Sequence, residues 1–268
     1  MLRSAFVTAT RFVGAVVVST ALATSAAVAL PQFTWSPSAI GGIGSDIVAD
    51  NILISNYTTV TLTPNGGGGA DFLDTGVLPI TGFQLGDTPV TGTGLNTTFG
   101  LYFGFTGTGT QNTPDFNSST VGTFDTLDFT LYGYNVTDPV TYLPTNITPD
   151  GVVDPIALAT GSLISGGVGA TTLPGVAVVP NANTLLTFSP TVLGQAFFQD
   201  PNPFYSAVFS AFTNNPSQVT FTDDGFVISN GGGSANFLET PVPEPASLAL
   251  LGAGLAGLGL IRRRGAAA

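Results

Sequence analysis

Positive charge is confined to the two ends of this sequence, and that distribution restricts how the chain between them can fold. The five arginines are Arg3, Arg11, Arg262, Arg263 and Arg264, and the sequence has no lysine, histidine or cysteine. Residues 30–242 carry fourteen aspartates and Glu239, a formal charge of −15 with no basic partner. Salt bridges and disulfides cannot form there, so apolar burial and backbone hydrogen bonds must hold the fold together.

The same composition argues against several classes of function. Without Lys or Arg, residues 30–242 have no electrostatic footprint for nucleic acid. Without His or Cys they cannot build a Ser-His-Asp triad, a thiol nucleophile or a zinc site. A glycoside hydrolase needs only a pair of carboxylates, but here no basic group is present to support such a pair in a substrate groove. We therefore predict that the protein is not an enzyme, with a glycoside hydrolase as the remaining catalytic alternative.

Apolar residues alternate with small or polar ones along much of the chain, which predicts an all-β domain. In residues 98–106 and again in residues 124–134, the large apolar side chains recur at every second position, so they share one face of a strand. Asp223-Asp224-Gly225 favours a tight reversal between two strands. In residues 203–212 apolar residues recur at an interval of four, a spacing that also fits a short helix. We expect residues 30–242 to form a β-sandwich of jelly-roll or immunoglobulin type.

The N-terminal segment has the organisation of a secretory signal. Arg3 and Arg11 precede an apolar core at residues 12–23, and small residues then lead to Ala27-Val28-Ala29. A basic region, an apolar core and an A-x-A site in that order are typical of a cleaved signal peptide. We predict a signal helix within residues 1–29, with Ala27 and Ala29 at the cleavage site.

The C-terminal segment, residues 243–268, predicts a membrane span. Pro243-Glu244-Pro245 leads into sixteen apolar or small residues, 246–261, and the cluster of Arg262, Arg263 and Arg264 follows. As a helix this run is about 24 Å long, slightly short of a hydrocarbon core of about 30 Å. The arginines favour the cytoplasmic side, which places the rest of the chain outside.

The triplet, the short apolar segment and the arginine cluster together resemble the PEP-CTERM sorting signal of Gram-negative bacteria. The resemblance implies recognition by a membrane protease of the exosortase type that removes the tail near the triplet. It also implies export across the inner membrane, transient anchoring there, and a final location at the cell surface or in the extracellular matrix. A permanent C-terminal membrane anchor is the simpler alternative. The sorting residues that the resemblance implies are Pro243, Glu244, Pro245, Arg262, Arg263 and Arg264.

Residues 30–242 carry a resemblance of their own. The segments concerned are FTWSPSA (33–39), LPITGFQLG (78–86), GLYF (100–103), GTFDTL (122–127), NPFY (202–205) and GGGSANF (231–237). They are similar to the flocculation-associated PEP-CTERM proteins. This resemblance implies a secreted protein that promotes floc or biofilm formation together with extracellular polysaccharide.

An internal repeat raises the possibility of calcium binding. Residues 65–75 recur as residues 230–240 with eight of eleven positions identical. The repeat predicts two equivalent glycine-rich segments, each leading into a strand. The first copy matches a calcium-binding nonapeptide, since glycine turns expose carbonyls and an Asp carboxylate completes an oxygen cage. Aspartates in such chains also cap turns through their own backbone. The candidate Ca²⁺ ligands are Asp71, Asp74, Asp223 and Asp224, and further acidic pairs are Asp46 with Asp50, Asp125 with Asp128, and Asp150 with Asp154.

Aromatic side chains offer a second binding hypothesis. Exposed tryptophan and tyrosine rings can stack on sugars, which would make the domain a carbohydrate-binding module. The same rings can instead pack in a core or across strands. The residues concerned are Trp35, Tyr57, Tyr102, Tyr132, Tyr134, Tyr142 and Tyr205.

Overall fold

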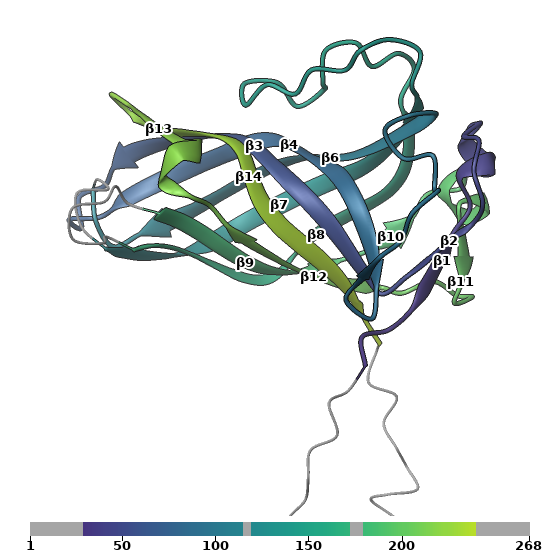
Figure 1. The fold of residues 1–268 in the computed structure, drawn as a ribbon. Coiled ribbons are helices and arrows are strands. Elements are labelled where there is room, and N and C mark those ends of the chain that lie inside the picture. The colour runs from purple at the N-terminus through teal and green to yellow at the C-terminus, as the bar shows by residue number, and fades with distance from the viewer. Residues whose placement is uncertain (1–28, 115–118, 172–178, 240–268) are drawn as a thin grey trace, which may run out of the picture.

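Eight of the strands in the computed structural model, which describes residues 29–114, 119–171 and 179–239, close into an antiparallel barrel (Figure 1). Neighbouring strands follow the order β8-β7-β6-β4-β3-β14-β12-β9, and β9 pairs back with β8 to complete the ring. The barrel strands are β3 (Asn51–Pro64), β4 (Ala70–Leu85), β6 (Phe99–Gln111), β7 (Thr120–Asn135), β8 (Ile156–Thr171), β9 (Val179–Thr187), β12 (Ala207–Thr213) and β14 (Gly225–Leu238).

The predicted β-sandwich is wrong, although the prediction of an all-β domain is confirmed. A sandwich consists of two sheets with free edges, whereas here the pairing of β8 with β9 leaves the barrel without an edge. Glycines allow the sheet to curve tightly at positions where an aromatic ring from the neighbouring strand lies over the glycine. A Cβ at Gly161 of β8 would collide with the ring of Phe129, and a Cβ at Gly109 of β6 with the ring of Phe72.

The strands predicted from alternation are confirmed, and the possible helix is not formed. Residues 99–106 and 124–134 fall within β6 and β7, with the predicted phenylalanines and leucines facing inward, and residue 98 directly precedes β6. The Asp223–Gly225 reversal joins β13 (Val219–Thr222) to β14. Residues 203–212 run instead into strand β12, where every second side chain is buried. An interval of four is a multiple of two, so it suits a strand as well as a helix.

An aromatic cluster fills one end of the barrel. The small sheet formed by β1 (Phe33–Trp35), β2 (Ile47–Ala49) and β11 (Phe198–Asp200) lies at this end (Figure 1). Trp35 is fully buried, with ring centroids 5.4 Å from Phe83 and 6.2 Å from Phe237. The remaining short elements are β5 (Thr88–Pro89), β10 (Ser189–Pro190), η1 (Pro37–Ile40), η2 (Gly194–Ala196) and η3 (Pro216–Gln218).

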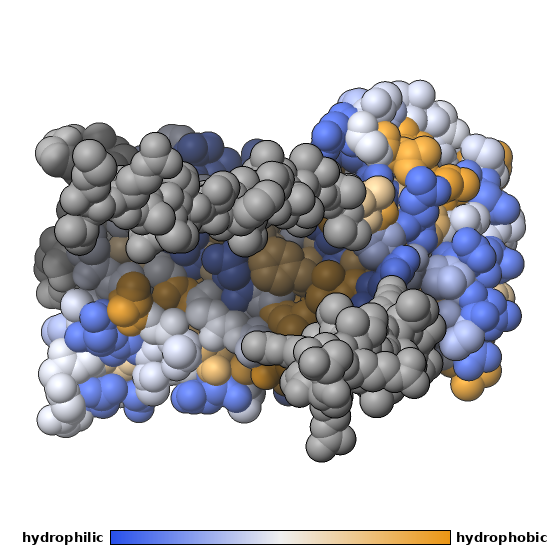
Figure 2. All heavy atoms as spheres, turned by 90° about the horizontal axis from the view of Figure 1, so that it is seen from below, coloured by the Kyte–Doolittle hydropathy of each residue, from blue (hydrophilic) through white to orange (hydrophobic). Residues whose placement is uncertain are grey.

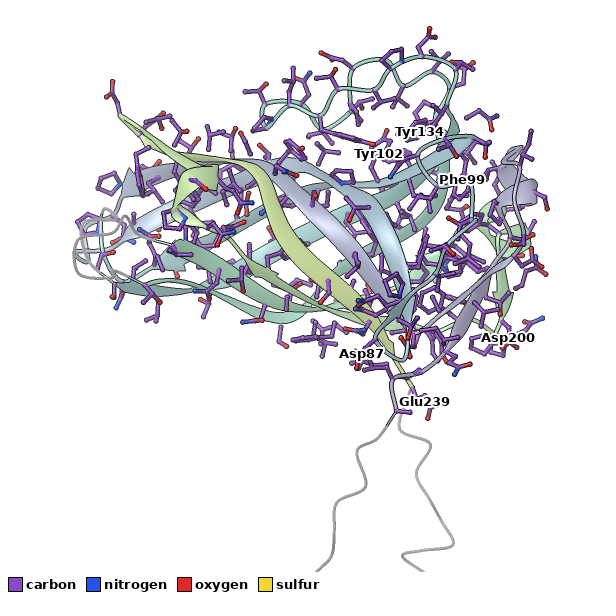
Figure 3. All side chains as sticks on the ribbon, viewed as in Figure 1. Asp87, Phe99, Tyr102, Tyr134, Asp200 and Glu239 are labelled. Carbon is purple, nitrogen blue, oxygen red and sulfur yellow. The ribbon has the colours of Figure 1, made fainter. Side chains whose placement is uncertain are left out.

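A tyrosine cluster lies on the outer face of the barrel under a covering loop, residues 136–155. Tyr102 and Tyr134 are buried there, close to the loop (Figure 3). The loop contributes Tyr142, whose hydroxyl lies 2.8 Å from that of Tyr134 and whose ring centroid is 5.7 Å from that of Tyr57. Burial raises the pKa of both hydroxyls in the Tyr134–Tyr142 pair, so this bond joins two neutral groups at physiological pH.

Replacing Tyr142 with Phe is expected to loosen the covering loop without unfolding the barrel. The substitution removes a part-buried hydrogen bond worth about 1 kcal/mol and keeps the ring. Amide hydrogen exchange should therefore become several-fold faster in the loop and stay unchanged in the strands. Tyr132→Phe is the control, because this ring stacks on Tyr102 and its hydroxyl forms no hydrogen bond within the described residues. Equal exchange in both variants would contradict the assigned role of the Tyr142 hydroxyl.

Both ends of the described chain leave the barrel side by side at the end with the aromatic cluster (Figure 1). The Tyr205 hydroxyl donates to the Gln32 carbonyl at 2.7 Å, and the rings of Phe33 and Phe237 are 5.2 Å apart. Figure 2 shows this side of the molecule, where hydrophilic and hydrophobic residues are mixed on the visible surface. Among the described residues, no helix has the length and apolarity needed to cross a membrane. The predicted signal and sorting helices fall on residues outside that description.

Candidate functional site

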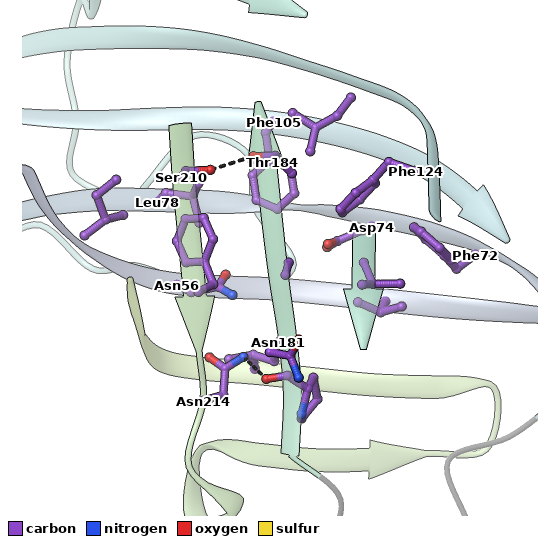
Figure 4. Close-up of a pocket in the computed structure, with 18 of the residues that line it drawn as sticks. Asn56, Phe72, Asp74, Leu78, Phe105, Phe124, Asn181, Thr184, Ser210 and Asn214 are labelled. Carbon is purple, nitrogen blue, oxygen red and sulfur yellow. Dashed lines mark hydrogen bonds between the residues drawn. The ribbon is translucent and has the colours of Figure 1, made fainter. Parts of the chain in front are cut away.

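The interior of the barrel contains a cavity of about 110 Å³ (Figure 4). Its wall is mainly apolar because the inward positions of the strands carry phenylalanine and branched aliphatic residues. Phe72 and Phe124, for example, meet edge to face with centroids 5.3 Å apart. An apolar space with a few polar groups is the usual form of a small-molecule site, so the polar groups of this lumen decide what it can hold.

Two asparagines bring unpartnered amide oxygens to the cavity wall. Asn56 lies on β3 and Asn214 directly follows β12; both line the cavity, and both are more than nine-tenths buried. The Oδ1 atoms of both residues have no hydrogen-bond partner within the described part of the chain. The Asn214 Nδ2 donates to the Pro180 carbonyl at 2.9 Å, which fixes the orientation of that amide. A buried acceptor without a donor costs about 1–3 kcal/mol, so these two atoms mark a place where a donor belongs.

Gly231 makes room for this pair of asparagines. It lies on β14 directly opposite Asn56, at a point where the register of the β3–β14 pairing shifts. A Cβ at position 231 would collide with the Asn214 Oδ1 and press on the Asn56 Cβ. The preceding residue, Asn230, has a φ of +61°, which turns the strand at this point. The absence of a side chain at Gly231 therefore leaves room for both asparagine side chains, and we call this space the niche of Asn56 and Asn214.

Asp74 is the carboxyl group of the lumen, and its environment disfavours the charged form. The residue is half-buried, and its side chain borders the cavity on the inner side of the barrel wall. Burial raises its pKa from 3.8 to about 7, and the hydrogen bond donated by the Thr58 hydroxyl opposes this in part. Of the described residues that line the cavity, Asp74 alone carries a carboxyl group, so the lumen does not hold the carboxylate pair that glycoside hydrolysis needs.

The remaining polar groups of the wall are satisfied or lie near the barrel mouth. The hydroxyls of Thr184 and Ser210 are hydrogen-bonded to each other at 2.6 Å (Figure 4). A second, more polar pocket of about 550 Å³ shares Thr120, Val168 and Asn181 with the cavity. The cavity therefore adjoins the end of the barrel where β7 begins and β8 ends.

The structure does not bring the four predicted calcium ligands together. Asp71 and Asp74 are three residues apart on β4 and so face opposite sides of the sheet, with Asp71 exposed outside and Asp74 inside. Asp223 and Asp224 form the exposed turn before β14. Among the described residues, no three acidic side chains are close enough to hold a metal ion.

Several of these aspartates accept hydrogen bonds from other parts of the fold, mostly from side chains and not from the adjacent backbone that a turn cap would use. Asp46 accepts from the Ser36 hydroxyl at 2.7 Å, and Asp50 accepts from the Gly86 amide at 2.8 Å. Asp71 accepts from the Asn65 amide at 3.0 Å, and Asp150 accepts from that of Asn146 at the same distance. Calcium binding at Asp71, Asp74, Asp223 and Asp224 stays a prediction without a formed cage.

The aromatic residues proposed to stack on sugars are not exposed. Trp35 and Tyr102 have no accessible surface and Tyr134 is 2 % exposed, so the expectation of an exposed Trp35 is wrong. These rings are buried by packing against other side chains. Trp35 packs in the aromatic cluster, and Tyr102 and Tyr134 pack under the covering loop. The other four tyrosines are half-buried: Tyr57, Tyr132, Tyr142 and Tyr205.

The two copies of the internal repeat are not equivalent entries into strands. In the first copy Asn65 accepts from the Gly67 and Gly69 amides and forms the turn before β4. Residues 230–238 of the second copy lie within β14, and β3 separates this strand from β4. The later parts of the copies do correspond, since the alanine and phenylalanine of each point inward and the leucine outward.

The lumen site itself could not be located from sequence patterns of known sites. One feature of the sequence does point to the site: Asn56 is a polar residue on the apolar face of an alternating strand, the face that also carries Ile54 and Val60. Asn214 follows a strand whose inward positions end at Phe212, and it gave no such signal.

The residues predicted for processing lie almost entirely outside the described part of the chain. Ala29 is exposed at the start of the first described range. The structure therefore neither confirms nor corrects the individual roles of the others, which stay predictions. The residues outside the description are Ala27, Pro243, Glu244, Pro245, Arg262, Arg263 and Arg264.

Comparison with known families finds the PEP-CTERM protein-sorting motif at residues 241–264, a range that includes the triplet and Arg262, Arg263 and Arg264. This confirms the predicted sorting motif and marks the chain as a substrate for exosortase, a membrane protease. The motif implies export and transient membrane anchoring. No curated protein and no solved structure matches the chain. The resemblance to the flocculation-associated proteins is therefore carried by sequence segments alone.

Proposed function

We propose that this is a non-catalytic protein of the cell surface or matrix, which exosortase processes and which promotes floc and biofilm formation by associating with extracellular polysaccharide. Divalent cations bridge the acidic barrel to the polymer, and hydroxyl and amide groups add further contacts. The observation that carries the proposal is the distribution of charge on the folded domain.

All charged side chains in the described part of the chain are acidic, and most are exposed. Two of the described aspartates are buried or half-buried, namely Asp50, which is 7 % exposed, and Asp74 in the lumen. The exposed acids are Asp46, Asp71, Asp87, Asp125, Asp128, Asp138, Asp150, Asp154, Asp200, Asp223, Asp224 and Glu239. Asp87, Asp200 and Glu239 lie at the end of the barrel from which the termini leave (Figure 3).

A surface of this kind attracts cations and repels anionic polymers. With no basic residue on the barrel, neutralisation must come from solution, and interactions beyond about 10 Å are screened at 0.1 M salt. Divalent cations act at closer range because carboxylate oxygens on both partners can coordinate them. The carbohydrate-binding alternative depends on exposed rings, and it is less well supported because Trp35, Tyr102 and Tyr134 are buried and the other four tyrosines are half-buried.

We expect the processed protein recovered from cells to cosediment with polysaccharide from the same cells' matrix in the presence of Ca²⁺, and to be released by a chelator. Sodium chloride at matched ionic strength is the control, because it screens charge without bridging. A variant with Asp125, Asp128, Asp223 and Asp224 changed to Asn should cosediment several-fold less. These side chains are exposed, so the substitutions leave the core intact.

The outcomes separate the parts of the proposal. Absence of cosedimentation under every condition would remove the association with polysaccharide. Cosedimentation that the chelator leaves unchanged would remove the cation bridge alone. Release of reducing sugar from the polymer would restore the glycoside hydrolase alternative.

A further inference from the structure

We infer that the barrel lumen binds a small, uncharged molecule with an apolar body and a hydrogen-bond-donating group, and that the donor is received by the niche of Asn56 and Asn214. This site is separate from the acidic outer surface, and the inference does not depend on the proposed function.

The donor requirement follows from the two amide oxygens. Both Oδ1 atoms are buried without a partner on residues that line the cavity. The Asn214 amide cannot simply rotate its oxygen away, because its nitrogen is held by the Pro180 carbonyl. The Asn56 Oδ1 likewise has no partner within the described part of the chain, so it too can accept a hydrogen bond from a ligand. A hydroxyl or amino group placed in the niche would supply the missing donor.

The lack of charge follows from the rest of the wall. An anion would find no basic group in the lumen and would meet the Asp74 carboxyl. A cation would lose its hydration among mainly apolar side chains, which is costly unless it is fully paired. A neutral molecule avoids both penalties.

The size follows from the cavity. Its volume of about 110 Å³ is somewhat smaller than that of an apolar protein cavity of about 150 Å³ known to hold benzene. A body of roughly six or seven non-hydrogen atoms is therefore suitable. The adjoining pocket shares Thr120, Val168 and Asn181 with the cavity, so it lies directly beside this space.

Phenol and toluene provide the test, because they differ in one hydroxyl and have nearly the same shape. Titration of the full processed protein by ligand-observed NMR, with thermal unfolding as a second readout, should show phenol binding about tenfold more tightly than toluene. Aniline, also a donor, should resemble phenol, whereas benzoate should bind more weakly than toluene.

Asn56→Leu and Asn214→Leu should each abolish the preference for phenol while leaving toluene binding unchanged. Asn202→Leu is the matched control, since this exposed residue follows β11 and lines neither the cavity nor the adjoining pocket, and it should keep the preference. If the two lumen variants fail to fold, the comparison of phenol with toluene on the unaltered protein still decides. Equal affinity for the two compounds would overturn the inference, and so would the absence of binding by either, which would leave the niche to water alone.

Discussion

At pH 8, the Asp74→Asn variant should unfold at a temperature on the order of 10 °C higher than the unaltered protein. Burial in the barrel raises the pKa of Asp74 from 3.8 to about 7. An Asp74 carboxylate that is ionised in the folded state at pH 8 therefore lowers the free energy of unfolding by roughly 4 kcal/mol. Asparagine carries no charge and can still accept the Thr58 hydrogen bond, so the substitution removes this cost.

The advantage of the variant should depend on pH in a defined direction. The folded-state pKa of Asp74 lies above its unfolded-state value, so the stability associated with this group is complete below about pH 4. It is lost as the pH rises from about 4 to 7, where the unfolded chain has released the proton and the folded chain has not. The variant and the unaltered protein should thus unfold alike near pH 4, diverge up to about pH 7, and then differ by a constant amount.

Thermal or urea unfolding at a series of pH values provides the measurement. Asp71→Asn is the matched control, because Asp71 lies on the outer face of the same strand and is exposed. It removes the same charge from the protein, and its effect should be small at every pH. A difference between Asp74→Asn and the unaltered protein that does not change with pH would contradict the enclosed position of this carboxyl.

Replacing Phe237 with Ala should lower the free energy of unfolding by about 3–5 kcal/mol. Phe237 is fully buried in β14 and connects the small end sheet to the barrel. Its ring centroid lies 5.2 Å from that of Phe33, 4.9 Å from that of Phe188 and 4.9 Å from that of Phe204. Removing it leaves a cavity among rings that cannot all move to fill it.

Urea denaturation of Phe237→Ala measures this loss, and Phe209→Ala serves as its control. Phe209 lies on β12, next to the residue that pairs with Phe237, but it points outward and is 38 % exposed. Its truncation should cost about 1 kcal/mol or less. Equal losses in the two variants would show that the end cluster does not carry the stability assigned to it.

The strands could be predicted from the sequence because their information is local. Alternation places Phe99, Leu101 and Phe103 on one face whatever the sheet they belong to, and the reversal at Asp223–Gly225 depends only on its own residues. The closing pair of β8 with β9 depends on the combined curvature of all eight strands. A sandwich and a barrel share the same alternation, and so the sequence alone did not separate them.

The lumen site was missed for a related reason. Asn56, Asn214 and Gly231 belong to three different strands or strand ends, and their proximity arises from the β3–β14–β12 pairing. The acidic residues chosen for calcium were neighbours in sequence, but alternation sends Asp71 and Asp74 to opposite sides of β4. In a sheet, side chains contact residues of neighbouring strands more often than residues of their own strand. The spacing of residues along the sequence does not show which strands are neighbours.

The position of the two chain ends determines how the barrel is oriented while the C-terminal tail is anchored in the membrane. Ala207 is paired with Leu238 and with Thr187, and Thr213 faces Asn181 at the other end of the same strands. A tail held in a bilayer therefore tethers the barrel by one pole and leaves the mouth of the lumen at the far pole, turned towards the solution. Strand β14 ends at Leu238, before the sorting motif begins at 241, so cutting the tether takes no strand from the described sheet. The described barrel, residues 29–114, 119–171 and 179–239, is therefore left whole when the tail is removed.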